Sequence, residues 1–241
     1  MQLEIKNLSY KYKSNSENIL KDLNLSIKKG IKLGVFGPNG AGKTTLISLL
    51  TGILTPNKGT INFFNEIGKQ SKSNLGYVPQ DFALYEELTM HENLMFFGVM
   101  SGLSKKEAHA KSKELISKLG LEKHQQKKVK HFSGGMKRRV NLAIGLTNDP
   151  GILILDEPVV GVDAQSKNAI LKYLNHLNQT GTTIIYTSHE LMEAEEFCDY
   201  FVFIDGGVFV LEGELQELLK TNQVKNLKEL FLKVTGEEYR D

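Results

Sequence analysis

The chain has 241 residues, 40% of them hydrophobic, which is enough to bury the core of one domain of ordinary size. Its net charge is only +2, and its arginines are Arg138, Arg139 and Arg240, so the composition does not favour a protein that reads nucleic-acid phosphates. The single cysteine, Cys198, excludes an internal disulfide and is expected to be a small buried hydrophobe. No apolar run approaches the ~18 residues that span a bilayer, and no signal peptide is recognisable, so we expect a cytosolic chain.

In chain order, alternating polar and apolar residues first predict strands over 3–8 and 23–27. A short apolar run over 31–36 predicts a buried strand, and a helix is predicted over 43–50. Further strands are predicted at 59–64 and 75–78. The first strands indicate an antiparallel β subdomain.

The loop between the strand at 31–36 and the helix at 43–50 fits the phosphate-binding pattern G-x-x-x-x-G-K-S/T. Glycines let successive backbone N–H groups point at phosphate oxygens, and the helix start attracts the same anion. Lys43 is expected to reach the β- and γ-phosphates, and Thr44 to hold Mg²⁺. The sequence therefore predicts that the chain binds a nucleoside triphosphate through Gly37, Pro38, Asn39, Gly40, Ala41, Gly42, Lys43, Thr44 and Thr45.

The period of the apolar residues then becomes helical from Thr89 to Leu119, with a break at Gly102 and a new start at Ser104, a preferred N-cap residue. A polar connector over 122–130 is expected to be a solvated linker.

Strand patterns return at 151–156, 182–186 and 200–204, with a helix predicted over 165–178. Because these strands are continuously apolar and alternate with helices, they are expected to pair in parallel and to be buried on both faces. Two short amphipathic helices near the end, 215–219 and 227–234, are expected to dock on the core.

These elements predict an α/β fold. It has a P-loop NTPase core with a mostly parallel sheet, an N-terminal antiparallel β subdomain and an inserted α-helical subdomain at about 84–148. The whole chain, 1–241, is expected to be a single nucleotide-binding domain with a C-terminal helical tail at about 213–241.

The apolar strand at 151–156 leads into two carboxylates, Asp156 and Glu157. Open α/β sheets keep their ligands at this end of their strands. Asp156 suits a Mg²⁺ site, through water or as an outer ligand. Glu157, expected on the opposite face of the strand end, could polarise an attacking water.

Ser133, Gly134 and Gly135 come before another predicted helix. Ser133 is expected to be its N-cap, and the glycines leave backbone N–H groups bare for an anion. As an isolated pattern this is an ordinary helix cap.

Taken in this order, the motifs resemble those of the ATP-binding-cassette family, the ATPase subunits of ABC transporters, over nearly the whole chain. The motifs are the phosphate loop, Gln80, Ser133-Gly134-Gly135, Asp156-Glu157, Asp163 and His189. The resemblance implies that Tyr12, with Tyr10 as second choice, stacks on adenine and that His189 lies near the γ-phosphate. It implies that Gln80 contacts Mg²⁺ and the hydrolytic water, so that Thr44, Gln80 and Asp156 serve the metal. The implied catalytic residues are Lys43, Gln80, Glu157 and His189.

The same resemblance implies that two cassettes pack head to tail around ATP and Mg²⁺. Ser133, Gly134 and Gly135 of one chain would then face the γ-phosphate held by Lys43 of the other. Asp163 would communicate across that interface. A second cassette, identical or different, is therefore an expected partner.

Three features are most similar to ABC-2 type exporter ATPases: Ser-Gly-Gly-Met-Lys-Arg-Arg at 133–139, the helix start at 188–195 and the short leucine-bearing tail. This implies an ATPase that energises an exporter at the inner face of the cell membrane, with no nucleic-acid partner. Separate permease subunits would dock on Phe82, Leu84, Tyr85 and Leu88, unless these residues are buried in the helical subdomain.

Two alternatives remain. One is a soluble ATPase of the same family without a membrane partner, such as an iron–sulfur assembly ATPase. The other is a translation-factor or DNA-repair cassette, which is disfavoured because those proteins usually carry two cassettes in one chain or a long coiled-coil insertion.

Overall fold

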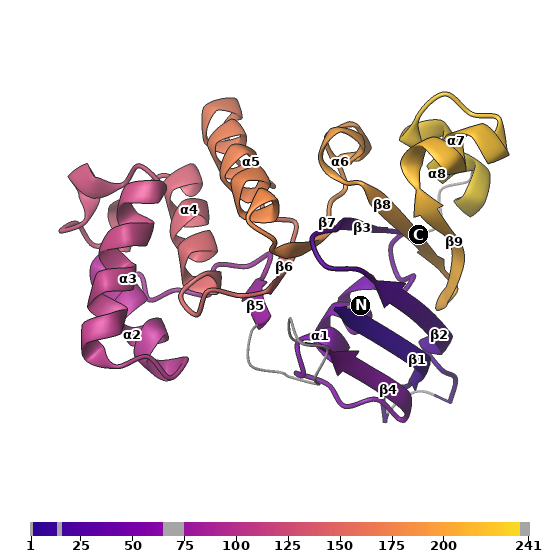
Figure 1. Cartoon of the computed structure of the whole chain (residues 1–241), viewed down its shortest axis with the longest axis horizontal. Helices are drawn as coiled ribbons and strands as arrows, with labels where there is room; N and C mark the ends of the chain where they lie inside the picture. Colours follow the sequence, from indigo (N-terminus) through magenta and orange to yellow (C-terminus); the bar gives the residue numbers. More distant parts are fainter. Residues whose placement is uncertain (1, 14–15, 65–74, 237–241) are drawn as a thin grey trace. The chain divides into compact units, whose positions relative to one another are not determined.

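The computed structural model describes residues 2–13, 16–64 and 75–236, which form two compact units (Figure 1). The first unit combines Met1–Ser73 with Thr183–Asp241, and the second is Asn74–Thr182. The chain thus leaves the first unit after residue 73 and returns to it with a strand that begins at Thr183.

One sheet of the first unit is antiparallel and three-stranded. Its strands, in sheet order, are β2 (Leu20–Ile27), β1 (Leu3–Tyr10) and β4 (Lys58–Phe63). Leu3 pairs with Ile27 on one side and with Phe63 on the other, and all three side chains are buried. This row of apolar residues fixes the register, since a slip of one residue would turn them to solvent. The predicted antiparallel β subdomain is confirmed.

The other strands of this unit make a mostly parallel sheet. They lie in the order β7 (Thr183–Thr187), β3 (Lys32–Phe36), β8 (Tyr200–Asp205) and β9 (Val208–Glu214). β3 is parallel to both β7 and β8, as the continuous apolar runs predict. β9 pairs antiparallel with β8 and was not predicted. The Gly206-Gly207 turn before it is the sequence feature that marks a hairpin here, and in the structure its residues alternate between exposed and half-buried.

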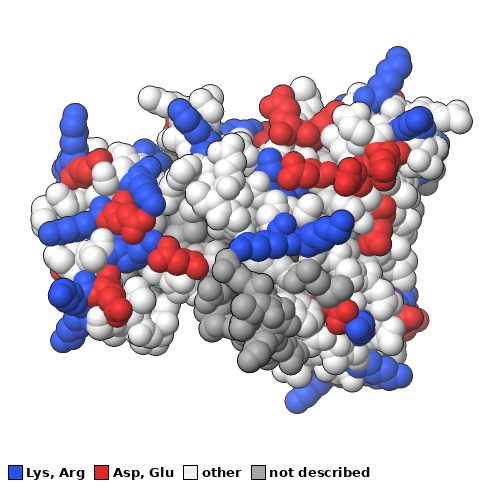
Figure 2. All heavy atoms as spheres, in the orientation of Figure 1, with Lys and Arg blue, Asp and Glu red and all other residues white. Residues whose placement is uncertain are grey.

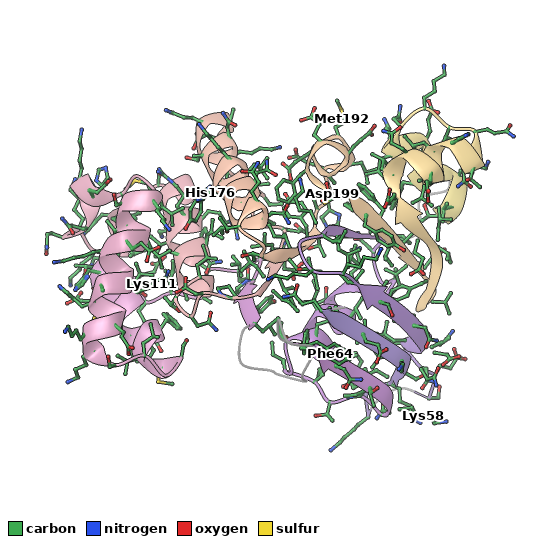
Figure 3. All side chains as sticks on the ribbon, viewed as in Figure 1. Lys58, Phe64, Lys111, His176, Met192 and Asp199 are labelled. Carbon is green, nitrogen blue, oxygen red and sulfur yellow. The ribbon has the colours of Figure 1, made fainter. Side chains whose placement is uncertain are left out.

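Among the described residues, four helices complete the first unit: α1 (Lys43–Leu50), α6 (Leu191–Phe197), α7 (Leu215–Asn222) and α8 (Leu227–Thr235). The tail docks on the core as predicted, because α8 packs against α6, α7 and β8. Leu227 and Leu230 are fully buried, and the Phe231 ring lies 6.4 Å from that of Phe203. Asp199, labelled in Figure 3, joins α6 to β8 and accepts a hydrogen bond from the backbone of Lys32 at 3.2 Å. Cys198 is buried, as expected.

The second unit contains two parallel strands, β5 (Leu75–Val78) and β6 (Ile152–Asp156), and four helices. The helices are α2 (Met90–Met100), α3 (Lys105–Lys118), α4 (Gly134–Gly145) and α5 (Ala164–Gln179). The predicted break at Gly102 separates α2 from α3. Both helices begin with a capping box, formed by Thr89 with Glu92 and by Ser104 with Glu107. The connector at 122–130 forms short 3₁₀ turns.

The surface of α3 carries charges of both signs. In Figure 2, acidic and basic side chains are interleaved over the helices of this unit, at the left. Glu114 forms ion pairs with Lys111 at 3.1 Å and with Lys118 at 2.6 Å. Lys111, labelled in Figure 3, also pairs with Asp149 in the turn before β6, which ties α3 to that turn. Within the described part of the chain, no helix has both the length and the apolar character needed to cross a membrane.

Candidate functional site

The phosphate loop lies between β3 and α1, as predicted. The N-cap of α1 is Gly42, with a φ of 109°, and it has no side chain that could accept hydrogen bonds from the first turn. A Cβ atom at Gly42 would lie 2.6 Å from the Leu20 side chain, so both space and backbone conformation require glycine there. The first N–H groups of this eight-residue helix therefore face the loop without a capping side chain, an arrangement that binds anions.

Lys43 folds back over this loop. Its ammonium group donates hydrogen bonds to the backbone carbonyls of Gly37 at 2.7 Å and Pro38 at 3.0 Å. Thr44 is exposed, whereas Thr45 is buried. The loop thus brings together a cation, a helix start without a capping side chain and one accessible hydroxyl, and these features define a P-loop nucleotide-binding protein.

Tyr12 is attached to the same loop. The hydroxyl groups of Tyr12 and Thr45 are 3.2 Å apart and hydrogen-bonded. Tyr12 is 38% exposed and Tyr10 only 8%, and the two rings meet edge to face at 5.0 Å. Tyr12 is therefore the more accessible of the two tyrosines.

His189 follows the strand that pairs with β3. β7 runs parallel to β3, with Tyr186 opposite Gly34. Because β3 ends at Phe36 and β7 at Thr187, the phosphate loop and the segment with His189 both begin at the carboxyl end of this sheet. His189 is exposed, and the segment turns there because the Ser188 hydroxyl accepts a hydrogen bond from the N–H of Glu190 at 2.9 Å.

Gln80 and Glu157 meet in the second unit for the same geometric reason. β5 and β6 are parallel with Val78 opposite Leu155, so the residues two places further on are also level. The Gln80 amide donates a hydrogen bond to the Glu157 carboxylate at 3.1 Å. Asp156 is the last residue of β6.

One part of the sequence interpretation needs correction. β6 ends at Asp156, so strand alternation does not place Glu157. Glu157 instead adopts a left-handed backbone conformation, with a φ of 49°, and is only 8% exposed. Non-glycine residues in this region are strained, and such strain concentrates at functional sites.

Ser133, Gly135 and Asp163 also come together in the second unit. Ser133 is the N-cap of α4, as predicted, and its hydroxyl accepts a hydrogen bond from the N–H of Met136 at 3.3 Å. Asp163 caps α5 by accepting a hydrogen bond from the N–H of Ser166 at 2.9 Å, which lowers the pKa of its carboxyl group. A Cβ atom at Gly135 would lie 2.8 Å from Cβ of Ser166 and 2.9 Å from Oδ2 of Asp163. The two helix starts therefore touch, with glycine at the contact.

Sequence reasoning missed the role of Arg138. This arginine is buried, and its guanidinium group donates a hydrogen bond to the backbone carbonyl of Gln80 at 2.6 Å. The available signal was its rarity, because Arg138 belongs to the only adjacent pair of arginines in the chain.

The sequence and the fold both have known counterparts. A family model described as ABC transporter matches residues 20–160. A linearmycin resistance ATP-binding protein of Bacillus subtilis is 43% identical over 220 residues, 90% of this chain and 70% of that protein. A Nod factor export ATP-binding protein I of Burkholderia lata is 38% identical over 207 residues, 84% of this chain and 68% of that protein.

Two solved structures share the fold. An ATP binding subunit of an ABC transporter is 30% identical, with a TM-score of 0.86, and the match covers 97% of this chain and 99% of that one. An ATP-binding cassette, solved as a dimer in a post-hydrolysis state with ADP and Pi, is 25% identical, with a TM-score of 0.76 over 88% of this chain and 98% of that one. The chain therefore belongs to the ABC transporter family, and its fold is that of an ATP-binding cassette.

Proposed function

We propose that this chain hydrolyses ATP as one of two cassettes packed head to tail, and that it thereby drives an exporter whose ABC-2 type permease is a separate chain. Relatives named for linearmycin resistance and Nod factor export support the exporter assignment. These relatives are longer, since this chain spans 70% and 68% of their lengths. The observation that carries the proposal is the Gln80–Glu157 pair followed directly by an exposed apolar segment.

The residues present fit ATP and Mg²⁺. The start of α1, which has no capping side chain, and the Lys43 ammonium suit phosphate oxygens, and the exposed aromatic Tyr12 suits a base. Thr44, Gln80 and Asp156 carry the oxygen atoms that Mg²⁺ prefers. Bound with ATP, Mg²⁺ would neutralise charge on the phosphates during phosphoryl transfer.

The buried carboxylate of Glu157 is the group best suited to receive a proton from the attacking water. Its hydrogen bond to Gln80 fixes the direction of the carboxylate and leaves the glutamine side-chain oxygen for the water or the metal. His189, which follows β7 at the same end of the sheet as the phosphate loop, would donate a hydrogen bond to the phosphate end of the nucleotide.

The head-to-tail arrangement is supported by the start of α4. Ser133 is exposed at the N-terminus of a 12-residue helix, where the helix dipole favours an anion. We propose that this end, with Gly134 and Gly135, receives the phosphates held by Lys43 of a second cassette. Asp163, which touches the same helix start through Ser166, would then lie at the dimer interface.

The docking segment, residues 82–88, is where we propose that the permease binds. Phe82 is 40% exposed and Tyr85 50%, while Leu84 and Leu88 are half-buried. The Tyr85 ring packs edge to face on Phe96 at 5.1 Å, and Phe96 is also exposed. Exposed apolar side chains that gather in this way mark interaction surfaces.

A charge placed on this surface tests the proposal. Tyr85→Asp or Leu84→Asp should release the chain from native membranes, because a central apolar anchor is often worth ~2 kcal/mol or more, over tenfold in occupancy. Basal ATPase activity of the isolated chain should persist. Val210→Asp, which alters an exposed apolar residue on β9, is the matched control and should stay with the membranes.

Two results would count against permease docking at this segment. If the Asp variants unfold, these residues belong to the core of the helical subdomain. If they fold, hydrolyse ATP and still co-purify with detergent-solubilised membrane proteins, docking occurs elsewhere. A wild-type chain that never associates with membranes favours the soluble alternative.

A further inference from the structure

The backbone that carries Gln80 is held by side chains of α4. Arg138 donates to the carbonyl of Gln80 at 2.6 Å. Asn141, one turn further along the same face of α4, donates to the carbonyl of Pro79 at 3.0 Å and accepts from the N–H of Ala83 at 3.0 Å. Both α4 side chains are at least 95% buried. The segment 79–83 therefore depends on α4 for its hydrogen bonds as it leaves β5.

Arg138 also contacts two segments next to Gln80 and Glu157, the docking segment after Gln80 and the turn after Glu157. Its guanidinium carbon lies 4.8 Å from the centre of the Phe82 ring, the first residue of the docking segment. Its other terminal nitrogen donates to the carbonyl of Val160 at 3.4 Å. Val160 closes the turn that begins at Glu157, since its N–H donates to the Glu157 carbonyl at 3.4 Å. One side chain thus contacts the Gln80 backbone, the docking segment and the turn after Glu157.

The electrostatics fit this placement. Burial lowers the pKa of Arg138, and the charges of Asp81 and Glu157 oppose that effect. The guanidinium therefore lies within electrostatic reach of the Glu157 carboxylate. A lysine could not replace it, because a single ammonium group cannot bond two separate carbonyls and cover an aromatic ring at once.

We propose that Arg138 is a positioning residue that makes the Gln80–Glu157 geometry depend on the position of α4. The inference rests on the proposed hydrolysis. Ser133, the N-cap of α4, lies about 7.5 Å along the helix axis from Arg138 at 1.5 Å per residue. A phosphate bound at the start of α4, or a partner pressing on Phe82, would then act on Gln80 through the same guanidinium.

A mutant cycle between Arg138 and Gln80 tests this. Steady-state kcat, KM for ATP and thermal unfolding are measured for the full chain carrying R138K, Q80A or both. R138K should lower kcat by ~10-fold or more with KM little changed, since small displacements of catalytic groups are costly. In the Q80A background the same substitution should have almost no further effect on kcat, because Arg138 acts through Gln80.

Arg139 provides the matched control. It is the next residue of α4, and its guanidinium donates to the carbonyl of Leu119 at the end of α3 at 2.9 Å. R139K makes the same chemical change away from Gln80, so whatever its own effect on kcat, it should combine multiplicatively with Q80A. F82L, which removes the ring beneath the guanidinium, should lower kcat in the wild-type background and not in Q80A.

The measured values of kcat and KM decide whether Arg138 positions Gln80. If R138K and Q80A reduce kcat multiplicatively, or if R138K changes only KM, Arg138 does not position Gln80. If R138K does not fold, the comparison of F82L in the wild-type and Q80A backgrounds replaces it: a multiplicative loss of kcat again means that Arg138 does not position Gln80. If Q80A leaves turnover unchanged, hydrolysis does not use Gln80 and this inference fails, whereas a wild-type chain without ATPase activity would overturn the proposed function itself.

Discussion

The side-chain amide of Gln80 lies 3.1 Å from the carboxylate of Glu157, although the two residues are 77 positions apart in the chain. They meet because β5 and β6 are parallel neighbours in matched register. The carboxylate is buried and its backbone is left-handed, so its orientation is set before any nucleotide binds. This preorganisation is what a general base requires.

Glu157→Gln should therefore keep ATP affinity and slow turnover by ~10²–10⁴, since the amide cannot accept the proton. It should also accumulate an ATP-bound dimer that elutes early in size-exclusion chromatography. Glu114→Gln, which changes an exposed carboxylate on α3, is the control and should turn over normally. Wild-type turnover in Glu157→Gln would remove Glu157 from the mechanism.

The sequence predicts well what depends on local patterns. Apolar runs locate β3, β6, β7 and β8, and glycine spacing locates the phosphate loop. The sequence already ranks Tyr12 before Tyr10, and the structure adds that Tyr12 is the more exposed of the two. β9 escaped prediction because its first residues do not alternate between polar and apolar, since the exposed positions Val208 and Val210 are themselves apolar.

The site residues that escaped prediction depend on long-range contacts. Arg138 bonds Gln80, 58 positions away in the chain, and Val160, 22 positions away. The periodicity of apolar residues in the sequence does not reveal hydrogen-bond partners this far apart in the chain. The left-handed turn at Glu157 is likewise invisible in an apolar strand followed by two carboxylates, because nothing in that pattern says where the strand stops.

Lys43→Ala should weaken ATP binding by about 10- to 100-fold, as expected for loss of a charged hydrogen-bond donor to the phosphates. Isothermal titration with ATP and Mg²⁺ measures this directly. Lys58→Ala, which removes an exposed lysine from β4, should bind normally. Equal affinity in Lys43→Ala and wild type would mean that the ammonium group keeps its carbonyl partners when ATP binds.

Two adjacent glycines at the start of α4 should respond differently to alanine. A Cβ atom at Gly135 would lie 2.5 Å from Oγ and 2.8 Å from Cβ of Ser166, whereas at Gly134 its nearest neighbour is 3.9 Å away. Gly135→Ala should cost about 1–3 kcal/mol of stability through overpacking, and Gly134→Ala should cost little. In a chain of this length, each kcal/mol corresponds to ~2–4 °C in Tm by calorimetry. Equal Tm values would show that the starts of α4 and α5 separate readily.

The proposed head-to-tail dimer predicts that two inactive variants can rescue each other. Ser133→Arg puts a bulky cation at the exposed N-cap of α4 and should prevent this helix start from receiving the partner's phosphates. Lys43→Ala removes the phosphate-binding ammonium group from the phosphate loop, which supplies the other half of each proposed site. Each proposed site joins the phosphate loop of one chain to the start of α4 of the other. Each variant alone should therefore lack activity, because both sites of its homodimer contain the substituted residue.

Mixing the two variants should create heterodimers with one intact site, in which the Ser133→Arg chain supplies Lys43 and the Lys43→Ala chain supplies Ser133. ATPase activity measured against mixing ratio should rise from near zero at both ends to a maximum near equal amounts. A mixture of Ser133→Arg with Ser133→Arg/Lys43→Ala contains no such site and is the control. If the first mixture stays inactive although size exclusion of Glu157→Gln with ATP shows a dimer, both sites must act together. If that dimer also fails to form, the chain does not work through the head-to-tail arrangement.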